Sequence, residues 1–76
     1  MRKAKRRSDG AVFKKGDFVI TSMCGVRMAG TIYKIKKDGI VKFYNVYQDG
    51  NNVTRRLTDI DHFDKTKQDV FVWLKS

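Results

Sequence analysis

Short runs of β-branched and aromatic residues, separated by glycine-containing turns, constrain the fold of this chain more than any other feature. The runs occupy residues 18–21, 31–37, 40–47, 53–57 and 70–75. Branched and aromatic side chains fit a pleated surface, so such runs are typical of strands. The chain contains no proline and no stretch with the spacing of a long helix. We therefore predict an all-β domain built from five strands, a small barrel.

The segments between these runs predict the turns. Asp38 and Gly39 form the strongest hairpin signal, because a primed two-residue turn needs the positive φ that Asp and Gly adopt readily. The imperfect alternation just before them indicates a bulge. Residues 22–30 contain two glycines and no clean period, which predicts a loop. Residues 48–52 form a second turn, and residues 58–69 form a polar segment that starts with one possible helical turn.

The alternation of the third and fourth runs predicts which side chains face the core. In the third run Val41, Phe43 and, more weakly, Asn45 share one face, while Lys42 and Tyr44 lie on the other. In the fourth run Arg55 falls on the inward face. An inward guanidinium is costly unless it is paired, so we expect a short edge strand or a register change there.

The last run is apolar on both faces. As a strand it places Val70, Val72 and Leu74 on one side and leaves Phe71 and Trp73 on the other. A chain of 76 residues covers both faces of a strand only rarely. We therefore expect Phe71 and Trp73 to form part of a partner-binding surface.

The charge of the chain is strongly asymmetric. It carries 17 Lys and Arg against eight acids, all Asp, for a net charge of +9. Residues 1–15 hold seven basic side chains and one acid and so contribute +6, while the remaining residues contribute +3. Residues 1–11 also lack apolar periodicity. We predict a flexible, disordered basic arm over residues 1–11 and a barrel domain over residues 12–76.

Basic side chains that neutralise phosphates release condensed counterions, and this produces sequence-independent, salt-sensitive affinity for nucleic acid. DNA is favoured over RNA because the sequence shows no aromatic-rich RNA platform. A solvated tail, or an arm that contacts an acidic protein, remains an alternative. The candidate phosphate-binding residues are Arg2, Lys3, Lys5, Arg6, Arg7, Lys14, Lys15, Lys34, Lys36, Lys37, Lys42, Arg55 and Arg56.

The order of motifs resembles the SH3-like small barrels of the Tudor and KOW families over residues 14–60. "KKGDFVI" and "GTIYKI" are similar to their opening strands, and "VKFYNVYQDGNNVTRRLTDI" to the Tudor continuation. This resemblance implies a five-stranded SH3-like barrel. It also implies that Tyr44 and Tyr47 match half of the Tudor aromatic cage, whose first-loop positions fall at Met23 and Met28. The first-loop glycine of the KOW pattern is displaced to Gly25.

Tyr44 and Tyr47 thus have two possible roles, stacking on a partner or packing at the barrel end. No enzyme signature accompanies them. His62 has aspartates nearby but no ligand set of recognisable spacing, and Cys24 has neither a second cysteine nor a nearby histidine. We expect no catalytic residue, no metal and no cofactor.

These observations predict a non-enzymatic nucleic-acid-binding protein that contacts the phosphate backbone. The alternative is a Tudor-like protein-interaction module, or a small viral or accessory regulator of a transcription, translation or chromatin-type machine. No apolar run reaches the roughly 20 residues of a membrane-spanning helix, and the N-terminus does not resemble a secretory signal. We expect a cytoplasmic or nucleoid-associated location without membrane contact.

Overall fold

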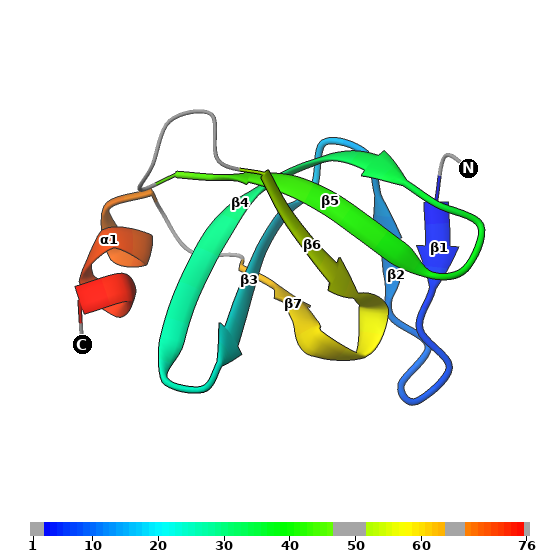
Figure 1. The fold of residues 1–76 in the computed structure, drawn as a ribbon, viewed down its shortest axis with the longest axis horizontal. Coiled ribbons are helices and arrows are strands. Elements are labelled where there is room, and N and C mark those ends of the chain that lie inside the picture. Colours follow the sequence, from blue (N-terminus) through cyan, green and yellow to red (C-terminus); the bar gives the residue numbers. More distant parts are fainter. Residues whose placement is uncertain (1–2, 47–51, 64–66, 76) are drawn as a thin grey trace.

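A curled antiparallel sheet carries a two-stranded hairpin at one end and a short helix at the other (Figure 1). The computed structural model describes residues 3–46, 52–63 and 67–75. Its elements are β1 (Lys3–Lys5), β2 (Val12–Lys14), β3 (Phe18–Met23), β4 (Val26–Ile35), β5 (Ile40–Asn45), β6 (Asn52–Arg56), the 3₁₀ helix η1 (Leu57–Asp59), β7 (Ile60–His62) and α1 (Lys67–Lys75).

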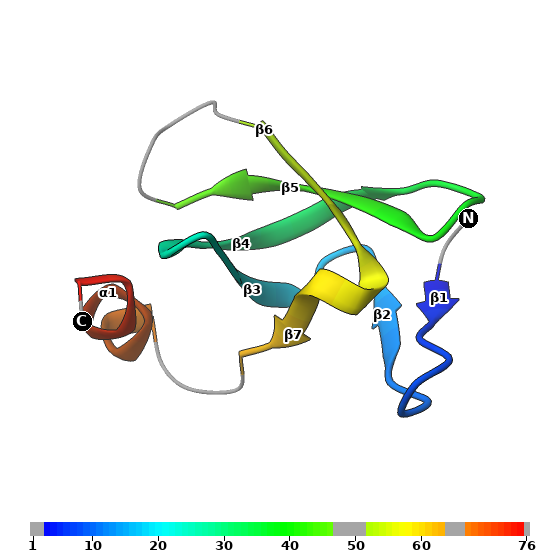
Figure 2. The same cartoon turned by 60° about the horizontal axis from the view of Figure 1, so that its bottom comes forward.

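The main sheet has the strand order β6-β5-β4-β3-β7, and every neighbouring pair is antiparallel. The sheet curls so that its two edge strands, β6 and β7, are joined directly by η1 (Figure 2). The predicted all-β class is confirmed. This half-barrel with a 3₁₀ connection is compatible with an SH3-like barrel.

The core lies inside the curl. It is formed by nine buried side chains from β1 to β7: Ala4, Phe13, Val19, Ile32, Ile35, Val41, Phe43, Val53 and Ile60. The face predicted for the third run is confirmed, because Val41, Phe43 and Asn45 of β5 are all buried. The predicted bulge is also confirmed, since the β4–β5 register shifts between Ile32 and Lys34.

The predicted loop over residues 22–30 is wrong. The β3–β4 ladder continues as far as the pair Met23 and Val26, so only Cys24 and Gly25 lie in the turn. Both have positive φ, 53° and 79°, as a primed hairpin turn requires. The strand pattern is weak here because this end of the hairpin is exposed on both faces.

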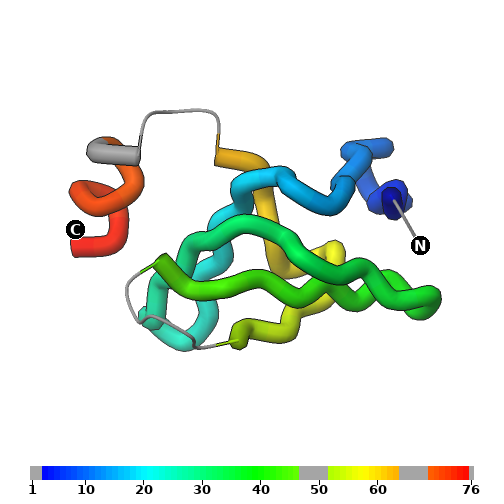
Figure 3. Tube along the Cα trace, turned by 90° about the horizontal axis from the view of Figure 1, so that it is seen from above, coloured from blue at the N-terminus to red at the C-terminus, as the bar shows by residue number. Residues whose placement is uncertain are grey.

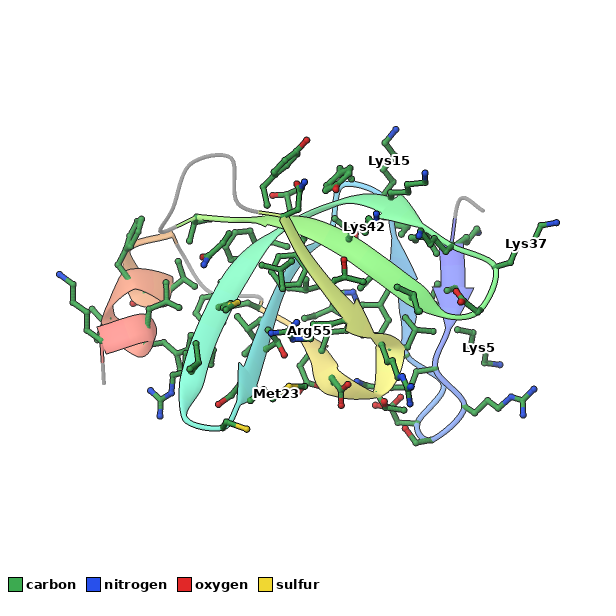
Figure 4. All side chains as sticks on the ribbon, viewed as in Figure 1. Lys5, Lys15, Met23, Lys37, Lys42 and Arg55 are labelled. Carbon is green, nitrogen blue, oxygen red and sulfur yellow. The ribbon has the colours of Figure 1, made fainter. Side chains whose placement is uncertain are left out.

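The predicted hairpin at Asp38 and Gly39 is confirmed in place, but its turn is wider than a two-residue primed turn. Only Gly39 has positive φ (78°), and the Lys36 amide donates to the Ile40 carbonyl at 2.8 Å. The wider turn projects Lys37 beyond the end of the sheet (Figure 4).

The N-terminal segment differs from the predicted disordered arm. Residues 3–5 pair with residues 12–14 as β1 and β2, and Ala4 and Phe13 are buried in the main core. A period-two pattern of three residues is too short to detect in the sequence. The hairpin owes its position to the buried side chains of Ala4 and Phe13 and to Arg6.

Arg6 uses all five of its N–H donors. Its Nε and Nη2 atoms donate to the carboxylate of Asp9 at 3.0 and 2.7 Å, and Nη2 also reaches Asp61 at 3.1 Å. Nη1 donates to the carbonyls of Leu57 and Ile60. The guanidinium also lies over the Phe13 ring, 5.3 Å from its centroid. Arg6 thus fastens the hairpin to η1 and β7.

The predicted last strand is wrong, because residues 67–75 form the helix α1. Val70 is buried and Trp73 and Leu74 are half-buried, whereas Val72 is 69% exposed. This is helical spacing, which a short apolar run does not reveal. The edge of β3 that a last strand would occupy is taken by β7.

The polar segment after residue 57 is more ordered than predicted. The expected helical turn exists as η1, although no side chain caps it. Residues 60–62 then form β7, which pairs with β3, and the Thr21 hydroxyl donates to the Asp59 carbonyl at 2.7 Å. One buried residue, Ile60, was too weak a signal for a strand.

Gly30 allows β4 and β5 to approach each other, and it provides the first test. A Cβ on Gly30 would lie 1.7 Å from the carbonyl oxygen of Tyr44 and 2.8 Å from the Phe43 ring. Since a backbone carbonyl in a ladder cannot move aside, we expect Gly30→Ala to lower the free energy of unfolding by about 3 kcal/mol or more. Urea unfolding measures this loss. Thr31→Ala, at the exposed neighbour, is the control and should change stability by less than about 1 kcal/mol.

The Arg6 cluster predicts a specific acid sensitivity. Hydrogen bonds from Arg6 and from the Ala11 amide lower the pKa of Asp9 to about 2. A carboxylate with a depressed folded-state pKa stabilises the fold above its ordinary pKa of about 3.9, and this contribution is lost as the pH falls toward 2.

We therefore expect the difference in unfolding free energy between the wild type and Asp9→Asn to shrink as the pH falls from about 4 to about 2. Urea unfolding at several pH values measures it. Thr31→Ala, which removes no titratable group from an exposed position, should show no such convergence. A constant difference for Asp9→Asn would contradict the assignment.

Candidate nucleic-acid interface

Five basic side chains from three segments of the chain line one groove of about 820 Å³. Lys5 comes from β1, Arg7 from the β1–β2 connection, Lys37 from the β4–β5 turn and Arg56 from the end of β6. The other lining residues are Arg6, Ser8, Asp38, Gly39, Leu57 and Thr58. Figure 4 shows Lys5 and Lys37 at the same end of the molecule. We call this site the basic groove.

Two hydrogen bonds that involve the Leu57 backbone hold the walls of the basic groove together. The Leu57 amide donates to the Gly39 carbonyl at 3.0 Å, which ties η1 to the β4–β5 turn. Arg6 donates to the Leu57 carbonyl at 3.1 Å, which ties the N-terminal hairpin to η1. Leu57 therefore joins all three segments that carry the cations.

The basic groove has a surplus of positive charge. Arg6 pairs with both Asp9 and Asp61, whose two negative charges exceed its own positive charge. The four other cations of the basic groove form no ion pair within the described residues. Among those residues, Asp38 is the one acid in the lining of the groove. Ser8 and Thr58 add hydroxyl groups at the rim. Convergent cations and hydroxyls are the donor set that phosphate oxygens prefer.

Two further pairs of lysines lie directly opposite each other in the sheets. Lys34 of β4 faces Lys42 of β5, and Lys3 of β1 faces Lys14 of β2. Like charges in directly opposed positions destabilise a sheet, and none of these lysines forms an ion pair among the described residues. A bound polyanion would relieve this repulsion.

Tyr44 stacks on Tyr33, a residue that the sequence analysis did not select. The two ring centroids are 4.4 Å apart and the planes differ by 20°. Tyr44 remains 49% exposed. Its predicted neighbour Tyr47 lies outside the described residues, as does Arg2. The bulge after Ile32 places Tyr33 beside Tyr44, and spacing alone does not reveal that contact.

The remaining basic candidates are dispersed. Lys15 and Lys36 are exposed in turns. Arg55 instead points into the curl beside β3 (Figure 4). It is half-buried, donates to the Thr54 carbonyl at 2.8 Å and lies 3.9 Å from the sulfur of Met28. The inward face predicted for Arg55 is confirmed.

Phe71 and Trp73 lie on α1, at the opposite end of the molecule from the basic groove (Figure 3). Arg27, another residue that was not selected, donates to the Trp73 carbonyl at 2.7 Å and lies over its ring at 5.3 Å. Trp73 is also close to the Phe63 ring, at 6.4 Å. Trp73 therefore anchors α1, while Phe71 is 40% exposed. A partner surface at this end stays a prediction.

His62 has structural contacts. Its ring stacks on Phe13 at 4.2 Å, and Nε2 lies 3.0 Å from the carboxylate of Asp17. Within residues 3–46, 52–63 and 67–75, no cluster of three or more His, Cys or Asp side chains is arranged to hold a metal ion. No helix in those ranges is long and apolar enough to cross a membrane.

Comparison with known proteins gives no precedent for this site. No family model matches the chain, and neither the curated proteins nor the solved structures contain a significant match. The resemblance to Tudor and KOW barrels therefore rests on short sequence motifs, while the strand arrangement is compatible with an SH3-like barrel in general.

Arg55 provides a test of whether its inward contacts stabilise the fold. Its Nε is buried and has no hydrogen-bond partner in the part of the chain that the structure describes, and an apolar replacement of a poorly satisfied polar group is neutral or stabilising. We expect Arg55→Leu to leave the free energy of unfolding unchanged or to raise it by about 1 kcal/mol. Arg56→Leu, on the exposed face of the same strand, is the matched control. A loss above about 1 kcal/mol in urea unfolding for Arg55→Leu alone would show that its contacts stabilise the fold.

Proposed function

We propose that this protein is a non-enzymatic nucleic-acid-binding module of the SH3-like barrel type that holds the phosphate backbone in its basic groove. The observation that carries the proposal is the convergence of Lys5, Arg7, Lys37 and Arg56 on one groove. These positions are up to 51 residues apart in the sequence. Only the fold brings them together.

The electrostatics support a polyanion rather than a single small anion. The unpaired cations of the basic groove are accompanied by two opposed lysine pairs in the adjacent sheets. The chain as a whole carries +9. A linear array of phosphates can contact several of these positions at once, and each contact releases counterions. DNA is the expectation from the sequence.

The alternative of methyl-lysine reading through a Tudor-type cage has less support. A cage presents ring faces from several sides to a cation, whereas Tyr33 and Tyr44 stack flat on each other. Lys34 and Lys42 lie on the same part of the sheet. Their charges would repel a cationic ligand.

The N-terminal hairpin contributes to binding as part of the folded domain in this proposal. Ala4 is in the core and Arg6 is fully engaged, so a deletion of residues 2–7 would damage the fold. Point substitutions of exposed cations are the appropriate test.

The test is the salt dependence of binding to a fluorescently labelled oligonucleotide, measured by anisotropy. If the four unpaired cations of the basic groove each neutralise one phosphate, the logarithm of the affinity for duplex DNA should fall with a slope of roughly −3 to −4 against the logarithm of salt concentration. Lys37→Ala should reduce the magnitude of this slope by about 1.

The matched control is Lys75→Ala, which removes the same charge from the end of α1, far from the basic groove (Figure 1). It should leave the slope nearly unchanged. Binding that is insensitive to salt, or equal losses for Lys37→Ala and Lys75→Ala, would refute the proposal.

A further inference from the structure

We infer that the outer face of β4 and β5 binds single-stranded nucleic acid, with an unstacked base on the ring of Tyr44 and the adjoining phosphates on Lys42, Lys34 and the basic groove. This inference rests on the proposed function and names its substrate class. It begins from the Tyr33–Tyr44 stack, which the charge argument does not use.

The stack prepares Tyr44 to receive a base. Tyr33 lies against one face of the Tyr44 ring, 4.4 Å away and nearly parallel. Tyr44 is nevertheless 49% exposed, so about half of the residue stays accessible to a ligand although Tyr33 stacks on its ring. A ring already fixed by a neighbour loses little conformational entropy when a base stacks on it.

Three alternate rows of paired residues in the β5–β6 ladder connect Tyr44 to the basic groove. Tyr44 is paired with Asn52, Lys42 two residues along β5 is paired with Thr54, and Ile40 is paired with Arg56. Side chains two residues apart share a face, about 7 Å from one another. The rows of Tyr44 and Arg56 are therefore about 13 Å apart.

The lysines occupy the middle of this path. Lys42 and Lys34 lie directly opposite each other in the β4–β5 ladder. Figure 4 shows Lys42 on β5 and Lys37 beyond it at the tip of the β4–β5 turn. If one base of a nucleic-acid strand stacks on Tyr44, the phosphates next to it would pass the lysine pair and enter the basic groove.

The chemistry of the path distinguishes single strands from duplexes. In a duplex, the faces of the bases are covered by their neighbours, and exposing one costs a few kcal/mol. A single strand offers its base faces without that cost, and aromatic side chains bind them with little sequence preference. The pair Tyr33 and Tyr44 also supplies an aromatic surface that the sequence alone did not show.

Tyr44→Leu tests the inference, because leucine keeps the apolar bulk and removes the ring. We expect the affinity for a single-stranded oligonucleotide to fall by roughly tenfold to a hundredfold, while the affinity for a duplex of equal length and the salt slope stay unchanged. Tyr44→Phe, which keeps the ring, should restore single-strand binding. Anisotropy titrations with a DNA strand, an RNA strand of the same sequence and the duplex measure the affinity of the wild type and of each variant. Urea unfolding confirms that each variant folds.

An abasic strand gives an independent readout. The wild type should bind an oligonucleotide of abasic linkers about as weakly as Tyr44→Leu binds the normal strand, because both lack the stack.

If Tyr44→Leu and the wild type bind normal single strands equally while Lys37→Ala still weakens binding, the inference is overturned and the basic groove stands. If salt-sensitive binding is absent altogether, the proposed function fails first. A loss with the RNA strand alone, or with the DNA strand alone, supports the inference and identifies which single strand is bound.

Discussion

The guanidinium of Arg6 is the interaction on which the arrangement of this molecule depends. It joins a three-residue strand near the N-terminus to the 3₁₀ turn and edge strand that follow residue 56. Hydrogen bonds that involve charged partners are the strong ones in proteins. Ala4 and Phe13 bury the apolar side of the β1–β2 hairpin in the main core, and Phe13 stacks on His62; Arg6 adds the polar link.

The Arg6 cluster also divides the basic residues into two groups. Asp9 and Asp61 both pair with Arg6, and within the described residues neither forms an ion pair with Lys5 or Arg7. Neighbouring residues in one short segment thus have opposite roles, one structural and the others exposed in the basic groove. A count of charges in the N-terminal segment cannot distinguish these roles, since they depend on which carboxylates the fold brings near.

The features of the fold that were predictable from the sequence are those that depend on residues close together in the chain. Alternation along β5 correctly predicted that Val41 and Phe43 are buried, because a strand's side-chain period is a local property. The hairpin at Gly39 and the inward Arg55 follow from similarly local signals. The helix α1 was misread as a strand, because its apolar run is short enough to fit either period and the choice depends on β7 already occupying the edge of β3.

The candidate site likewise combines residue types that the sequence indicates with contacts that only the structure shows. The sequence identified the cations and Tyr44 as residue types suited to nucleic acid, but it did not show which of them meet. Tyr33 and Arg27 were missed because their roles depend on single contacts, a ring stack across a bulge and a helix anchor. Those contacts join residues 11 and 46 positions apart.

By itself, the sequence determined the all-β class, the position of the central hairpin, the buried face of β5 and the surplus of positive charge. Each depends on neighbouring residues or on composition, which carry their physical consequences into any fold. Only the tertiary structure decided that the N-terminal segment pairs into the domain, that Arg6 is structural, and that cations from three distant segments share one groove. These outcomes depend on long-range packing between segments, where hydrogen-bond partners and neighbours are set by the curled sheet rather than by the order of residues.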